Sequence, residues 1–130
     1  MATTNTVLRT DEAWDGQKLP DYLVGKTEVV INKVLIPPKT NLPWHHHDVM
    51  SYAYVIRGEF YVVLKEENKE KHFKEGDVLC EVVGNIHRGE NRSDKECELV
   101  VFYPSVKDQT LMIKHPECEN TKKNLVFNII

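Results

Sequence analysis

The stretch "LPWHHHDVMSYAYVIRGEF", Leu42–Phe60, joins three consecutive histidines to an apolar, tyrosine-rich run that ends at a glycine. β-Branched and aromatic residues bounded by Pro and Gly are typical of a strand between two turns. Side chains at i and i+2 of a strand point to one face, with Cα atoms about 6.5 Å apart. His45 and His47 are therefore expected to share a face with Ser51, while His46 points the other way.

Similar short runs follow along the chain: "TEVVINKVLI", "KHFKEGDVLCEVV" and "ELVVFYP". Each is bounded by Gly, Pro, Asn or charged residues, and none carries apolar residues at helical spacing over three turns. The turns are placed at Pro37–Pro43, Gly58, Glu66–Lys71, Gly76 and Glu90–Glu96. This pattern predicts an all-β fold, a sandwich or a barrel.

The length of 130 residues favours a single domain. We divide it into an N-terminal arm (1–26), a barrel core (27–104) and a C-terminal extension (105–130), which could hold extra strands or be partly disordered. The run Phe60–Leu64 is apolar on both faces, so its outer face needs a cover. The candidates are the arm, with Trp14 and Leu19, the "NLVFNII" tail, or a second copy of the protein.

Composition excludes several classes of function. The net charge is −3, and no basic block could neutralise phosphates, so nucleic acid is not expected as a partner. No secretory signal and no apolar span of about 20 residues is present, so we expect a soluble, cytoplasmic protein without a membrane partner. The three widely spaced cysteines, Cys80, Cys97 and Cys118, are expected to be free thiols, the first two as small buried side chains.

Two imidazoles alone hold a metal weakly, because most first-row metal sites use three or four protein ligands. A third histidine would have to be His72, His87 or His115. His72 lies in a charged segment and is interpreted as a solvated strand residue, and His115 lies in the extension. His87 follows an apolar strand and a Gly-Asn turn, a position from which a side chain can be aimed inward.

The positions of these histidines and glycines resemble the two conserved sequence motifs of the cupin family. Its first motif, G-x5-H-x-H-x3,4-E-x6-G, is matched by His45, His47 and Gly58, without the leading glycine. The segment between the two motifs is short, as in small prokaryotic cupins. The resemblance covers Trp44 to about Asn91 and implies an antiparallel β-barrel, a double-stranded β-helix jelly roll.

The second cupin motif, G-x5-P-x-G-x2-H-x3-N, is matched at four spaced positions. These are Gly76, Gly84, His87 and Asn91, whereas Val82 stands at the proline position. The resemblance implies that His45, His47 and His87 meet on one divalent metal ion inside the barrel. Asn91 is expected to hydrogen-bond locally at a turn.

Ser51 stands where the first cupin motif has its glutamate. A serine hydroxyl is a poor ligand for a divalent ion, so this fourth position is interpreted as weak or vacant. Three neutral imidazoles suit Fe, Zn, Ni or Cu better than Mn or Mg, which prefer carboxylate oxygen. Three-histidine cupins that resemble this arrangement include thiol dioxygenases and diketone-cleaving enzymes.

The resulting hypothesis is a metal-binding cupin that acts as an oxygenase or another metal-dependent enzyme on a small organic substrate. The alternative is a non-catalytic cupin with a degenerate site that binds or senses a small ligand. The substrate pocket is expected to have a small apolar wall of Val49, Ala53 and Val55. Its partners are expected to be a small molecule and a second copy in a homodimer.

Two tyrosines and two glutamates near the histidines are expected to have structural roles. Tyr52 and Tyr54 point to the opposite face of the strand from His45 and His47. They are expected to pack under the N-terminal arm or a dimer partner. Glu81 and Glu90 are the acidic residues nearest to His87 in sequence. Either could act as a general base or accept a hydrogen bond from a ligand, but solvated glutamates are the stronger expectation.

Overall fold

The computed structural model describes residues 1–119, which fold almost entirely as strands. The strands are β1 (Thr27–Ile36), β2 (Thr40–Asn41), β3 (His45–His46), β4 (Tyr52–Arg57), β5 (Glu59–Leu64), β6 (Glu70–Lys74), β7 (Val78–Cys80), β8 (His87–Asn91), β9 (Cys97–Val106) and β10 (Ile113–Lys114). Residues 116–119 are helical. No helix among the described residues is long and apolar enough to cross a membrane.

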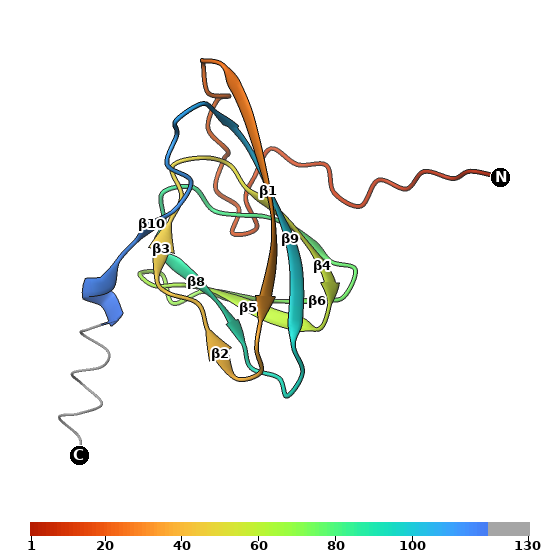
Figure 1. Ribbon diagram of the computed structural model, residues 1–130, viewed down its shortest axis with the longest axis vertical. Helices are drawn as coiled ribbons and strands as arrows, with labels where there is room; N and C mark the ends of the chain where they lie inside the picture. Colours follow the sequence, from red (N-terminus) through yellow and green to blue (C-terminus); the bar gives the residue numbers. More distant parts are fainter. Residues whose placement is uncertain (120–130) are drawn as a thin grey trace.

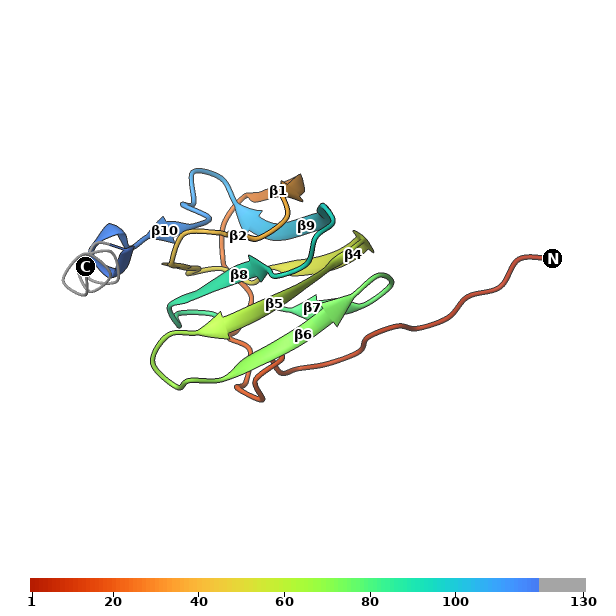
Figure 2. The same ribbon diagram turned by 90° about the horizontal axis from the view of Figure 1, so that it is seen from below.

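The strands form two antiparallel sheets (Figure 1). One has the order β1-β9-β4-β7, and the other has the order β10-β3-β8-β5-β6, with β2 also paired to β8. Figure 2 shows β8, β5 and β6 side by side in one layer. The prediction of an all-β, antiparallel fold is confirmed, although the described strands form two facing sheets and not one closed ladder.

The core lies between the two sheets because alternate residues of the central strands point inward. In β5, Phe60, Val62 and Leu64 are buried and their neighbours are half-buried. In β4, Ala53 and Val55 are buried, while Tyr54 and Ile56 are exposed on the outer face. The prediction that Tyr54 points to the face opposite Ala53 and Val55 is therefore confirmed. Within the described chain, the outer face of this sheet is uncovered.

Part of the N-terminal arm covers one end of the sheets. Trp14 and Leu19 pack against Leu64 and Val82, and the Trp14 amide donates a hydrogen bond to the Cys80 carbonyl (2.9 Å). Residues 1–10 leave this contact and run away from the sheets as an exposed strand-free segment (Figure 1). The "NLVFNII" tail, the second candidate cover, lies outside the described residues.

The chain after Pro104 contributes to the second sheet. β9 continues to Val106, and β10 then pairs with β3 through Ile113 opposite His46 and Lys114 opposite His45. The extension thus supplies an extra strand next to the histidines. Cys80 and Cys97 are buried free thiols, as predicted, and burial raises the pKa of each to about 11.

Asn91 is fully buried and ties three segments together. Its amide nitrogen donates to the carbonyls of Ile36, Pro37 and Lys95 at 2.8–3.1 Å. Its amide oxygen accepts from the Ser93 backbone and hydroxyl. The predicted local turn contact is present, and the bonds to the end of β1 add a long-range role.

Candidate metal centre

The three histidines of the predicted site are brought together by two paired strands. His45 opens β3, His87 opens β8, and the two residues lie directly opposite each other in the antiparallel register. His47 follows two residues after His45 on the same face. The rings are in mutual contact, with centroids 4.4–5.0 Å apart.

Backbone carbonyls fix the orientation of all three imidazoles. Nδ1 of His45 donates to Pro43 O (2.7 Å), Nδ1 of His47 to Leu111 O (2.9 Å), and Nδ1 of His87 to Asn85 O (2.8 Å). A carbonyl can only accept, so each Nδ1 must carry the proton and each Nε2 presents a lone pair. This is the tautomer that metal-binding histidines adopt when Nε2 is the ligand atom.

The three ring nitrogens converge on one point. The ligand atoms of His45, His47 and His87 all lie within 4.8 Å of one another, and all three residues are buried. Burial lowers the pKa of each ring to about 4, so the imidazoles are neutral at pH 7. Nε2 of His87 has no hydrogen-bond partner among the described residues, and such an unpaired buried acceptor is costly unless a cation meets it.

The nitrogens open into a cavity of about 280 Å³ between the sheets. Ala53 lines it, as predicted, but the predicted contribution of Val49 and Val55 is wrong because these two buried side chains do not line the cavity. Other apolar residues line it instead. These are Val34, Leu42, Phe60, Val62, Leu79, Leu99, Val101 and Met112.

Tyr103 and Lys114 are among the polar residues of this cavity that sequence reasoning missed. The Tyr103 ring lies 5.7 Å from the His47 ring, and burial raises the pKa of its phenol, which keeps it neutral. Lys114 forms no ion pair with residues 1–119. Both residues lie near or beyond Pro104, and only the pairing of β10 with β3 places Lys114 beside the site.

Ser51 is buried and lines the cavity, as its parity predicted. The expectation that Glu81 is solvated is wrong, because its side chain is 13% exposed and also lines the cavity. Oε2 of Glu81 lies 3.6 Å from Nε2 of His87. Glu90 is also buried, on the far side of β8, where it accepts hydrogen bonds from Arg88 (2.8 Å) and Arg92 (3.0 Å).

The other histidines lie outside the cluster. His46 points away from it, as predicted, and its Nδ1 lies 2.7 Å from Nε2 of His115. His72 is exposed on β6 and stacks on Tyr61, which agrees with its reading as a solvated strand residue. None of these three histidines contributes an atom to the group formed by His45, His47 and His87.

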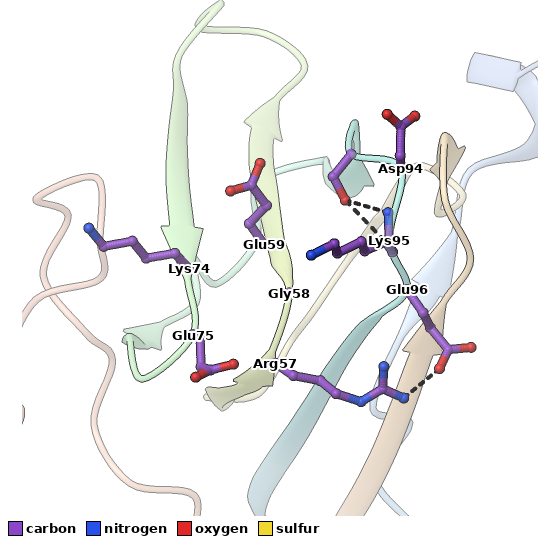
Figure 3. Close-up of a pocket in the computed structure, with 9 residues that line it drawn as sticks. Arg57, Gly58, Glu59, Lys74, Glu75, Asp94, Lys95 and Glu96 are labelled. Carbon is purple, nitrogen blue, oxygen red and sulfur yellow. Dashed lines mark hydrogen bonds and ion pairs between the residues drawn. The ribbon is translucent and has the colours of Figure 1, made fainter.

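A second, larger depression of about 710 Å³ lies where the turns after β4, β6 and β8 meet. Figure 3 shows charged side chains of both signs around it, with Arg57 bound to Glu96 and Lys74 directed away from the depression. No histidine or large apolar residue lines this surface. It therefore lacks both the ligand atoms and the apolar enclosure that the histidine cavity provides.

Comparison with known proteins gives the family. The profile of the Cupin domain matches residues 32–103, which is more than half of the chain and contains all three histidines. The chain belongs to the cupin family. No curated protein matches this cupin in sequence.

Solved structures share the fold of this cupin. The polyketide cyclase RemF from Streptomyces resistomycificus is 18% identical with a TM-score of 0.58, and the match covers 69% of this chain and 61% of that one. Oxalate oxidase in complex with glycolate is 24% identical with a TM-score of 0.58, covering 68% and 46%. Oxalate decarboxylase from Bacillus subtilis, with Mn(II) centres, is 19% identical with a TM-score of 0.57, covering 68% and 24%. The match spans less than two thirds of each of these proteins.

Proposed function

We propose that this cupin is a metal-dependent enzyme that acts on a small organic anion, with oxygen-dependent cleavage as the first reaction to test. One observation carries the proposal: three buried, neutral imidazoles with backbone-fixed Nδ1 atoms direct their free Nε2 atoms into one cavity. Histidines that only stabilise a core would have both ring nitrogens satisfied.

The donor set fits a divalent ion held by His45, His47 and His87. Imidazole nitrogen suits Fe, Zn, Ni or Cu, and three protein ligands leave positions for a substrate. A bound ion would supply Lewis-acid or oxygen-activating chemistry in this cavity. The Mn(II) centres of oxalate decarboxylase, one of the structural neighbours, support a metal in this fold but do not specify the substrate.

The other residues of the cavity favour a small anion. Lys114 provides a positive charge at the mouth of the cavity, and three neutral imidazoles do not cancel the charge of a cation. Tyr103 is a neutral phenol that can donate a hydrogen bond to a substrate oxygen. The volume of about 280 Å³ and the apolar wall suit a compact molecule with one anionic or chelating group.

Oxygen consumption by Fe(II)-loaded protein tests this function. In a panel of thiols, diketones and phenolic acids, we expect at least one anionic compound to cause oxygen uptake that the His87→Ala variant loses. Lys114→Ala should raise KM by about tenfold, the loss of one charged contact. Binding of panel compounds without any turnover would contradict the enzyme proposal and would indicate a ligand-binding cupin.

We also propose that the protein is a cytoplasmic homodimer. The free thiols favour a reducing compartment. The outer face of the β1-β9-β4-β7 sheet exposes Val29, Ile31, Leu35, Tyr54 and Ile56, each at 37–62% of its full accessible surface. Exposed apolar side chains gathered on one face of a sheet are typical of an interface between subunits, and a second copy presents an identical surface.

The Ile31→Lys variant tests the dimer. Light scattering on the eluting protein should give twice the chain mass for the parent and the single chain mass for the variant, because a charge in an apolar interface is desolvated without a partner. His72→Lys on the exposed face of β6 is the matched control and should remain dimeric. A monomeric parent would contradict the proposal.

A further inference from the structure

The carboxylate of Glu81 lies in the histidine cavity, whereas the sequence led us to expect a solvated side chain. Glu81 follows β7 directly, and its backbone amide donates to the Ser51 carbonyl (2.9 Å). The β4–β7 register pairs Tyr52 with Cys80 and Ala53 with Leu79, so Ser51 and Glu81 form the next rung of the ladder. Ser51, Ala53, Leu79 and Glu81 all line the histidine cavity, which places the Glu81 side chain on the metal-facing side.

The two carboxylate oxygens of Glu81 have different surroundings. Oε1 accepts hydrogen bonds from the Trp14 indole (2.8 Å) and from the Val82 amide (3.0 Å), so it is fully engaged. Oε2 accepts no hydrogen bond from the described residues and lies 3.6 Å from Nε2 of His87, which is itself unpaired. Two ligand atoms at about 2.1 Å from a tetrahedral ion are about 3.4 Å apart, close to this separation.

A buried carboxylate without a cation is costly, and so is a buried imidazole nitrogen without a partner. One cation between Oε2 and Nε2 would satisfy both atoms. Oε2 lies outside the group of described atoms that are within 4.8 Å of one another, so binding needs a torsion change at the end of the Glu81 side chain. Glu81 and the small residue Ser51 both line the cavity, so the Glu81 side chain borders open space on the side of the histidines.

We propose that Glu81 is the fourth protein ligand of the ion held by His45, His47 and His87, with Trp14 as a positioning residue that anchors its other oxygen. This inference rests on the proposed metal site and specifies its chemistry. A carboxylate oxygen makes the site acceptable to harder cations such as Mn²⁺, whereas three imidazoles alone favour Ni²⁺ or Zn²⁺. The N-terminal arm, through Trp14, thereby becomes part of the metal site.

Metal affinity in the full chain tests this assignment without any activity assay. Mn²⁺ binding is followed by electron paramagnetic resonance of the free ion, and Ni²⁺ binding by competition with a chromophoric chelator. Glu81→Gln, which keeps the shape of the side chain, should weaken Mn²⁺ binding by about tenfold or more and Ni²⁺ binding by less. Trp14→Phe should weaken Mn²⁺ binding by a smaller factor, and Glu28→Gln on the exposed part of β1 should change neither.

A variant that moves the carboxylate across the ladder separates a ligand from a purely structural residue. Adding Ser51→Glu to Glu81→Gln should restore part of the lost Mn²⁺ affinity, which a structural role of Glu81 does not predict. If Glu81→Gln binds both ions as the parent does, the Glu81 assignment is overturned and the three-histidine site stands. If the parent binds neither ion, the metal site itself fails and the assignment fails with it.

Discussion

Protein with His45→Ala and His87→Ala together is expected to be purified almost free of metal, whereas the parent, grown and purified without added ions, should carry about one equivalent. The variant keeps one of the three imidazoles, and a single buried imidazole holds a divalent ion weakly. Elemental analysis by mass spectrometry measures the difference directly. The expected loss is large because His45 and His87 are directly opposed across β3 and β8 and supply two of the three convergent nitrogens.

The matched control is His72→Ala on β6, which removes an exposed histidine far from the cluster in the sheet order. Its metal content should equal that of the parent. Equal metal in the double variant and the parent would show that the ion binds elsewhere. The unfolding midpoint of the metal-free double variant shows whether the fold is intact, so loss of metal can be separated from loss of structure.

Gly58→Ala should cause a large loss of stability for the addition of a single methyl group. Gly58 turns the chain from β4 to β5 with φ +79°, and a Cβ atom there would lie 2.7 Å from Glu96 O and 2.9 Å from Cys97 Cα. The positive φ costs an alanine about 1–2 kcal/mol, and the contact with backbone atoms adds about 1–3 kcal/mol. The sum is a large part of the free energy of unfolding of an ordinary domain.

Gly76→Ala separates these two contributions. Gly76 has φ +88°, nearly that of Gly58, but a Cβ atom there would meet nothing within 4 Å beyond its own chain neighbours. Only the conformational cost of about 1–2 kcal/mol should therefore appear. Urea unfolding of the two variants and the parent gives the comparison, and equal midpoints for Gly58→Ala and Gly76→Ala would show that the contact with β9 is absent.

The parts of the fold that follow from local rules could be predicted from the sequence. The alternation around Tyr54 placed the faces of β4 correctly, and the His45–His47 spacing placed two rings on one side. Gly58 could be predicted as a turn, because its neighbours are strand-forming residues. Its close contact with Cys97 could not, because that contact depends on the pairing of β4 with β9, about forty residues later in the chain.

The spacing of the cupin motif supported His87 as the third histidine, in addition to its local position after a strand and a turn. Strand periodicity alone left three candidates, and the apolar strand and Gly-Asn turn before His87 favoured it over His72 and His115. The structure explains the choice: the register of β3 with β8 places His45 opposite His87, whereas His115 reaches the outward-facing His46. Register between distant strands is a tertiary property that a single sequence does not reveal.

The Glu81 side chain was predicted to be solvated but is largely buried, and the cause is a distant contact. A glutamate at a strand end is usually exposed, and its immediate neighbours give no sign of burial. The cover comes from Trp14, 67 positions earlier, whose indole reaches the carboxylate. Lys114 was missed for a similar reason. It lies on β10 in the C-terminal extension, where the sequence did not predict a definite strand, and it reaches the site only because β10 pairs with β3.

X-ray absorption at the metal K-edge of the loaded protein tests most directly whether the three imidazoles share one ion. With Ni²⁺ or Zn²⁺ bound, we predict outer-shell scattering from three imidazole rings and a first shell of nitrogen and oxygen near 2.0–2.2 Å, about the usual bond lengths. The His45→Ala, His87→Ala variant, which should hold almost no metal, should give almost no signal from bound metal under the same loading. A parent spectrum without imidazole scattering, or with one ring only, would contradict the three-histidine metal site.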